Sequence, residues 1–265
     1  MPYFQYDPIQ INRFAQLHMT ELCNSRFIFC KTDFIPQEFE NIERLDEDVV
    51  LISGNSDYCI TDDIVKRAPK NIKKWFCQNR LSPHPLLESI PLGIENHQHC
   101  VREGHGIGYE HAVQKYRLSR DPPIITPTKF IYANFKTWTN PVHRQAVKQA
   151  AIDIPFITWQ DPNLTYSQFV HDILYHEAVL CPQGNDRGDN HRIYEVLYMG
   201  RIPITFNKLQ YEFLHKKFPT VLVEENSQLY DEGWLREQIQ IAKKNLNHNL
   251  LDFSYWKNLI MESVE

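Results

Sequence analysis

The residues best suited to chemistry lie close together between Gly184 and Glu195. Gly184 and Gly188 give a polar loop backbone freedom, and His191 and Arg192 follow in the first turn of an expected helix. The positive end of a helix dipole repels a cation unless a negative group lies beside it. A phosphate at the helix start would supply that charge, and loop N–H groups would add donors. The stretch therefore predicts a phosphate-binding site.

The elements expected around this loop form a strand–helix–strand unit. An apolar strand runs over Ala178–Cys181, and Asp189 or Asn190 can cap the helix that follows. Gly200 ends that helix, and a second strand runs over Ile202–Phe206. Ligands of open parallel sheets bind outside the carboxyl ends of the strands, which is where this loop is expected to lie.

The run from Cys181 to Ile204, CPQGNDRGDNHRIYEVLYMGRIPI, resembles the signature of exostosin-like glycosyltransferases. In that family a Cys-Pro-x-Gly-Asn loop leads through His-Arg to a helix with a glutamate and then to Gly-x-Ile-Pro-Ile. Weaker echoes of the family are WFCQNR at 75–80, IPLGIEN at 90–96 and YANFKTWTNPVHR at 132–144. Together the matched segments extend over about half of the chain.

The resemblance implies the GT-B architecture, in which two Rossmann-like domains face each other across a cleft. It also implies an inverting glycosyltransferase that moves a sugar from a nucleotide-sugar donor onto a hydroxyl of a glycan acceptor. The resemblance also implies a uridine diphosphate sugar as donor, because members of the family commonly use one. A GT-B enzyme does not need a metal ion, so we expect neither metal nor cofactor.

The order of elements along the chain agrees with an α/β fold, because short apolar strands alternate with helical stretches. Strands are expected at 27–30, 49–52, 74–77, 87–91, 129–134, 155–159, 178–181, 202–206 and 220–223. Residues 95–128 are polar and then proline-rich, as in an interdomain crossing. We therefore expect an acceptor-side domain at 1–125, a donor-binding domain at 126–248 and, at 249–265, a helix that crosses back to the first domain.

Eight residues of the second half are candidates for donor binding, because they follow expected strands or begin expected helices. They are Lys136, Arg144, Gly184, Asn185, Asp189, His191, Arg192 and Glu195. The cations would neutralise the charge that grows on the leaving diphosphate. Glu195 lies one turn after His191 and is placed to accept both hydroxyls of a ribose. An exposed arginine is more often a solvated charge, so the motif is what favours Arg192.

The composition excludes several classes of protein. The chain has 265 residues, 42% of them hydrophobic, which is enough for one large or two modest domains. A net charge of -5 argues against nucleic acid as the main partner. No apolar run approaches the roughly 20 residues that span a bilayer, and the N-terminal residues lack the apolar core of a signal peptide. We therefore expect a cytoplasmic protein. Because relatives of the exostosin-like family in animals and plants usually have a membrane anchor, the resemblance implies a viral or bacterial enzyme or a trimmed lumenal domain.

Six scattered cysteines without a CxxC pair are expected to be reduced thiols. A histidine-rich segment contains side chains that zinc prefers as ligands, but their spacing matches no known zinc-binding motif. We therefore expect a linker whose histidines contact the acceptor. Its members are His97, His99, Cys100, His105 and His111.

The catalytic base is expected at the carboxyl end of a first-half strand, facing the cleft. Asp57 is the preferred candidate, because the loop Ser53-Gly54-Asn55-Ser56 can approach a sugar and Tyr58 can shield the carboxylate from water. Asp33 is the next candidate. The histidine alternatives on the acceptor side are His84 and His105. Asp57 would otherwise serve only a turn before the helix expected near Asp62.

Two other functions fit parts of this pattern. A nucleotide-sugar-binding or glycan-binding protein could keep the donor fold without turnover. A Rossmann dehydrogenase is excluded, because no G-x-G-x-x-G follows a strand.

Overall fold

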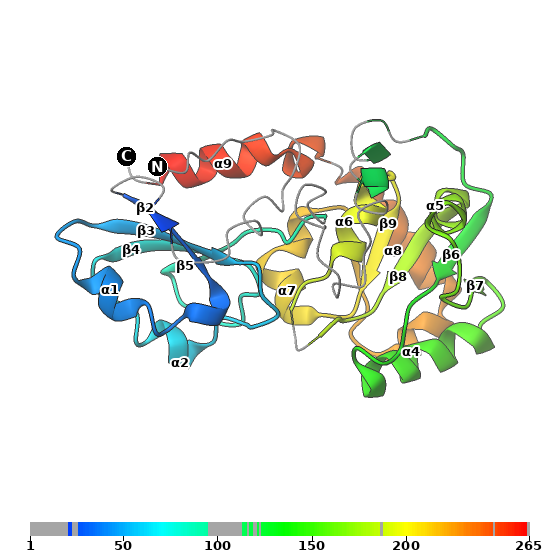
Figure 1. Cartoon of the computed structure of the whole chain (residues 1–265). Coiled ribbons are helices and arrows are strands. Elements are labelled where there is room, and N and C mark those ends of the chain that lie inside the picture. The colour runs from blue at the N-terminus through cyan, green and yellow to red at the C-terminus, as the bar shows by residue number, and fades with distance from the viewer. Residues whose placement is uncertain are drawn as a thin grey trace.

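The computed structural model shows two β-sheets with helices packed on their faces (Figure 1). The structure describes residues 21–22, 26–94, 113–115, 117–118, 121, 123–185, 188–245 and 247–263. The predicted α/β class with two sheets of parallel strands is confirmed and is compatible with two Rossmann-like domains.

The first sheet comes from the N-terminal half, with the order β1-β2-β3-β4-β5 among the described residues. Its strands are β1 (Glu21–Leu22), β2 (Phe27–Lys31), β3 (Val49–Gly54), β4 (Ile72–Cys77) and β5 (Leu87–Ser89). Strands β2 to β5 are parallel, whereas β1 pairs antiparallel with β2. The four expected strands are present. Strand β1 was not expected, since two residues carry no readable periodicity.

Both faces of this sheet are buried, which explains why its strands appear in the sequence as continuous apolar runs. Phe29 and Ile52 pack on one face, and Cys30 and Leu51 pack on the other. Helices α1 (Phe39–Glu43) and α2 (Asp62–Val65) contribute to the core on the second face.

The first face is covered by the end of the chain, helix α9 (Phe253–Glu262) (Figure 1). Its buried side chains Phe253, Trp256 and Ile260 share one core cluster with β2 and β3. The Trp256 indole also stacks on Phe218 of the second half, with 6.4 Å between ring centroids. Helix α9 therefore packs against both halves of the molecule.

The second sheet has the order β10-β9-β8-β6-β7, and all of its described pairings are parallel. Its strands are β6 (Lys129–Ala133), β7 (Ile157–Trp159), β8 (His176–Cys181), β9 (Ile202–Thr205) and β10 (Val221–Leu222). The helices between them are α4 (Pro141–Asp153), α5 (Tyr166–Tyr175), α6 (His191–Tyr198) and α7 (Lys208–Phe213). Because β6 and β8 are neighbours, the loops that follow them lie side by side at one edge.

The helical stretch that follows β10 is divided in two. A 3₁₀ segment, η4 (Asn226–Tyr230), precedes α8 (Glu232–Lys244). The side chain of Asp231 accepts a hydrogen bond from Trp234 N at 2.9 Å and so caps α8 where the two segments meet.

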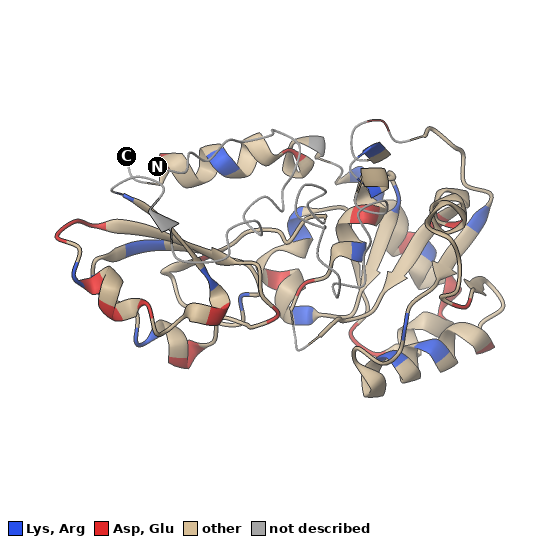
Figure 2. Cartoon of the chain, in the orientation of Figure 1, with Lys and Arg blue, Asp and Glu red and all other residues tan. Residues whose placement is uncertain are grey.

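The four described cysteines, Cys30, Cys59, Cys77 and Cys181, are buried thiols, as predicted. Burial raises the pKa of the Cys77 and Cys181 thiols to about 12, so both stay protonated at neutral pH. Acidic and basic residues are interspersed over both halves (Figure 2). Among the described helices, none combines the length and apolar character that crossing a membrane requires.

Candidate functional site

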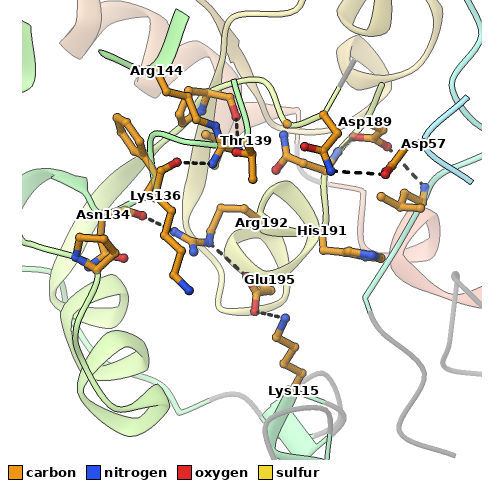
Figure 3. Close-up of a pocket in the computed structure, with 18 of the residues that line it drawn as sticks. Asp57, Lys115, Asn134, Lys136, Thr139, Arg144, Asp189, His191, Arg192 and Glu195 are labelled. Carbon is orange, nitrogen blue, oxygen red and sulfur yellow. Dashed lines mark hydrogen bonds and ion pairs between the residues drawn. The ribbon is translucent and has the colours of Figure 1, made fainter. Parts of the chain in front are cut away.

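A pocket of about 750 Å³ lies where the carboxyl ends of strands from both sheets come together. The loops after β2, β3 and β4 form one side, and the loops after β6 and β8 form the other. We call the second-half side the basic wall, for Lys136, Arg144 and Arg192, and the first-half side the acidic wall, for Asp33 and Asp57. Figure 3 labels the three residues of the basic wall and Asp57. The sequence placed all five of these residues at strand ends or helix starts.

Arg144 lies in the first turns of α4 and points back over the loop after β8. Its guanidinium donates to the carbonyl oxygens of Lys136 and Gln183 at 2.7 Å each, and to Pro182 O at 3.4 Å. Within the described residues no carboxylate forms an ion pair with it. Burial, and then the charge of Arg192, lower the pKa of Arg144 to about 10, which still leaves it charged at neutral pH. The wall thus holds a fixed cation whose described hydrogen bonds all go to backbone carbonyl oxygens.

Arg192 is held in the first turn of α6 by three different contacts. Nη1 donates to Asn134 O at 2.7 Å, Nε lies 3.2 Å from Glu195 Oε2, and the guanidinium covers the Phe169 ring at 4.1 Å. The neighbouring cation candidate, His191, has its Nδ1 2.7 Å from Gly93 O. A bound phosphate was expected to compensate for cations at this helix start. Glu195 contacts Arg192 as well, so this cation does not depend on a phosphate alone for compensation, and the expected phosphate stays a prediction.

Glu195 is a buried carboxylate that lines the pocket and has two cationic neighbours. Besides Arg192, the Lys115 ammonium lies 2.9 Å from Oε1, and the Tyr166 hydroxyl donates to the same oxygen at 3.4 Å. Lys115 lies in the stretch 95–128, which was expected to be an interdomain crossing, and its contact with Glu195 was not predicted. A lysine in a polar segment gives no signal that distinguishes it from a solvated charge.

Asp189 was expected to cap α6 and to bind the donor, and the structure surrounds its carboxylate with protein groups. His215 Nε2 lies 2.9 Å from Oδ1, the Tyr194 hydroxyl donates to Oδ2, and Leu92 N donates to Oδ2 at 3.4 Å. Burial alone would raise the pKa of Asp189, but His215, Tyr194 and a backbone N–H together hold it below its usual value. The helix begins after Asn190, whose side chain makes no capping hydrogen bond, so the predicted side-chain cap is wrong.

Polar contacts join the two halves beside the pocket, and we call this group the joint: Asn79, Arg80, Asp189 and Gln210. Asn79 Oδ1 accepts from Asp189 N at 2.8 Å, and Gln210 Nε2 donates to Arg80 O at 3.0 Å. Asn79 also donates to Ser56 O at 2.8 Å and has a φ of 54°. The contact requires glycine at 188, since a Cβ there would lie 2.7 Å from Asn79 Oδ1. In the sequence, Asn79 was noted only as part of the WFCQNR segment that resembles the family.

The acidic wall is more exposed to solvent than the basic wall. Asp57 is exposed, and its Oδ2 accepts from Asn185 Nδ2 of the opposite loop at 3.3 Å. Asp33 forms an ion pair with Lys31 at 3.2 Å. Tyr58 was expected to shield Asp57, but it is 63% exposed, and this prediction is wrong. The loop leads the Tyr58 ring into solvent rather than over the carboxylate.

The remaining site candidates divide between the pocket and other places. Gly184 lines the pocket beside Arg144, and Lys136 lies over the Trp138 ring with 4.8 Å from Nζ to the centroid. His84 is not among the lining residues. It lies in the turn before β5, where Nδ1 accepts from Leu86 N at 3.2 Å, because the chain must return to the amino-terminal edge to begin a parallel strand. His105 and the rest of the histidine-rich segment lie outside the described residues.

Across the described ranges, no three histidine, cysteine, aspartate or glutamate side chains gather as metal ligands would. The chain matches no protein-family model, and no curated protein matches it either. The chemistry of the pocket therefore has to be argued from its own residues.

Proposed function

We propose that the protein is an inverting glycosyltransferase that takes a nucleotide sugar as donor and a glycan hydroxyl as acceptor. The observation that carries this proposal is Arg144, a fixed cation on the pocket wall that no described carboxylate neutralises. On this side of the pocket the described charged lining residues are four cations, Lys115, Lys136, Arg144 and Arg192, and two carboxylates, Asp189 and Glu195, which leaves two positive charges. A nucleotide sugar carries two negative charges on its diphosphate, which is the complementary ligand.

In this proposal the diphosphate binds between Arg144 and Arg192, and the ribose hydroxyls donate to Glu195. The loop after β8, with Gly184 and Asn185, leaves room for the sugar beside the acidic wall. The meeting of strand ends from two parallel sheets supports a GT-B arrangement, as does the resemblance of the loop and α6 to exostosin-like glycosyltransferases. The donor is proposed to be a uridine diphosphate sugar by that resemblance.

The transfer step follows from the two walls. The acceptor oxygen attacks the anomeric carbon, its proton passes to the Asp57 carboxylate, and the bond from that carbon to the diphosphate oxygen breaks. The electron pair leaves with the diphosphate, whose extra negative charge Arg144 and Arg192 stabilise. Attack from the face opposite the leaving group inverts the anomeric configuration. No metal is required for this step.

The second candidate is a nucleotide-sugar-binding protein without turnover. One observation favours it: Asp57 is exposed and contacts Asn185, so the proposed base is less well enclosed than the basic wall.

A binding screen followed by a turnover assay tests both candidates. Nucleotides and nucleotide sugars that bind the folded state should raise the unfolding temperature, and diphosphates should do so more than nucleosides. Slow release of nucleoside diphosphate from the stabilising nucleotide sugar is expected of the enzyme. Binding without any release would support the binding protein, and no stabilisation by any phosphate compound would overturn both.

A further inference from the structure

Lys115, Glu195 and Arg192 form a buried ion triad along the basic wall (Figure 3). The side chains of Lys115 and Glu195 are 8% and 5% exposed, whereas that of Arg192 is 27% exposed. Removing a charge from water costs several kcal/mol, and the contact with the carboxylate offsets that cost for the ammonium. Lys115 therefore interacts with Glu195 as a buried partner and not as a solvated surface charge.

Two cations around one carboxylate do more than neutralise it. Figure 3 shows Glu195 between Arg192 and Lys115, which approach it from opposite sides. Arg192 contacts Oε2 and Lys115 contacts Oε1, so each oxygen has its own cation and the plane of the carboxylate is fixed. A carboxylate offers about four lone-pair sites, and the two ion pairs take one site on each oxygen. The Tyr166 hydroxyl donates to Oε1 at 3.4 Å, so among the described contacts one site on Oε2 stays open and a ligand hydroxyl at Oε1 would replace that long contact.

We infer that Lys115 is a positioning residue, which orients Glu195 to receive the two hydroxyls of a ribose and makes the pocket select ribonucleotides over 2′-deoxyribonucleotides. The inference rests on the proposed function and adds a second determinant of ligand choice. A diol needs two acceptor oxygens at fixed positions, and a carboxylate held at both ends supplies them. A ligand without the 2′-hydroxyl leaves one buried oxygen with an unmatched site, which lowers its affinity.

Without the ammonium, the triad has a different stable arrangement. The Glu195 carboxylate can turn to meet the Arg192 guanidinium with both oxygens, since two parallel N–H···O bonds are the preferred geometry of this pair. Both oxygens then face Arg192, and neither is held toward the ligand. Lysine at 115 prevents that rotation by holding Oε1 on the other side.

The test measures dissociation constants of uridine diphosphate and 2′-deoxyuridine diphosphate by calorimetry. The wild type should prefer the ribonucleotide by about tenfold or more, the factor that corresponds to about 1.4 kcal/mol. Lys115→Met should bring that ratio close to one, and Lys115→Arg should largely restore it. Lys243→Met is the matched control, because Lys243 forms a lysine–glutamate pair with Glu177 at 2.6 Å and does not line the pocket. The control should keep the wild-type ratio.

A double variant separates positioning from general damage to the fold. If Lys115 acts through Glu195, Lys115→Met combined with Glu195→Gln should have the same ratio as Glu195→Gln alone. A Lys115→Met protein that keeps the wild-type affinity ratio overturns the inference. A double variant whose ratio differs from that of Glu195→Gln alone overturns it as well. If Lys115→Met does not fold, Lys115→Gln is measured in its place. A Lys115→Gln protein with the wild-type affinity ratio then overturns the inference.

The result for the wild type distinguishes this inference from the proposed function. Equal affinity for the two nucleotides would overturn the role of the triad and leave the diphosphate site intact. Failure of both nucleotides to bind would overturn the proposed function, and the inference with it.

Discussion

The basic and acidic walls of the pocket face each other but are built in different ways. On the basic wall, Arg144 is held by three carbonyl oxygens and Glu195 by two cations and a hydroxyl. On the acidic wall, Asp33 and Asp57 are exposed residues. A side chain held from several sides needs little reorganisation when a charged ligand arrives, whereas an exposed carboxylate must first lose water. The difference suits a fixed donor site opposite an open site for a larger acceptor.

The largest effect is expected on the acidic wall, from Asp57→Asn. Loss of a general base should lower the rate of sugar transfer by a factor on the order of 100 to 10,000. Binding of the nucleotide should stay close to wild type, because the basic wall is untouched. Transfer to acceptor and nucleotide affinity are measured on the same preparation.

Asp33→Asn is the matched variant on the same wall, since it removes a carboxylate that is already paired with Lys31. Transfer at nearly the wild-type rate in Asp57→Asn would mean that the base lies elsewhere. A large loss in Asp33→Asn would then make Asp33 the base.

The joint between the walls should dominate stability. Asp189→Asn leaves the buried His215 and Tyr194 without a charged acceptor, which should lower the free energy of unfolding by about 3 kcal/mol. Because the pKa of Asp189 lies below its usual value, the stability from its carboxylate is present above about pH 4, the unfolded value, and is lost as the pH falls through the folded value. Urea unfolding of both proteins between pH 3 and pH 7 measures this. If the free energy of unfolding depends on pH equally in the wild type and in Asp189→Asn, the stabilising role of the Asp189 carboxylate is contradicted.

On the basic wall, Arg144→Ala and Arg192→Ala should each remove about 2 kcal/mol of transition-state stabilisation, or about 30-fold in kcat/KM. Arg236→Ala is the control, because Arg236 pairs with Glu232 on the surface of α8 and does not line the pocket. Unchanged kinetics in both pocket variants would falsify the assignment of the wall to the diphosphate.

The smallest effect is expected from a chelator. If the cationic side chains neutralise the leaving group, excess EDTA should leave the transfer rate within about twofold of its starting value, since no other charge is needed. The control is addition of manganese or magnesium to the untreated protein. Complete loss in EDTA that either metal restores would show that the basic wall is insufficient.

The sequence predicted strands best where burial alone decides them. Strands β2, β3 and β8 are apolar runs enclosed on both faces, so their residues reveal them without knowledge of the rest of the chain. Strand β1 depends on its pairing with β2, and the break before α8 depends on one capping contact at Asp231. Tertiary or single-residue effects of that kind leave little trace in periodicity.

The site could be predicted only as far as its motif extends. Arg192 and Glu195 lie in the pocket as their spacing indicated, because one helix sets their positions. Lys115 and Asn79 reach it from distant segments, and only the fold brings them there. Asp189 has the residue type of a ligand-binding group, yet its surroundings make it part of the packing between elements. Residue type and spacing do not distinguish these two uses of a carboxylate.

The two hydrogen bonds of Asn79 have a further consequence for how substrates influence one another. Its amide contacts both the Ser56 carbonyl, beside Asp57, and the Asp189 N–H, in the loop that leads to α6. One side chain thus connects the loop proposed to serve the acceptor with the loop proposed to serve the donor. If an acceptor shifts this amide and so changes donor affinity by some factor, the donor must change acceptor affinity by the same factor. An order of substrate addition would then have its origin in a single rigid side chain at the meeting of two loops.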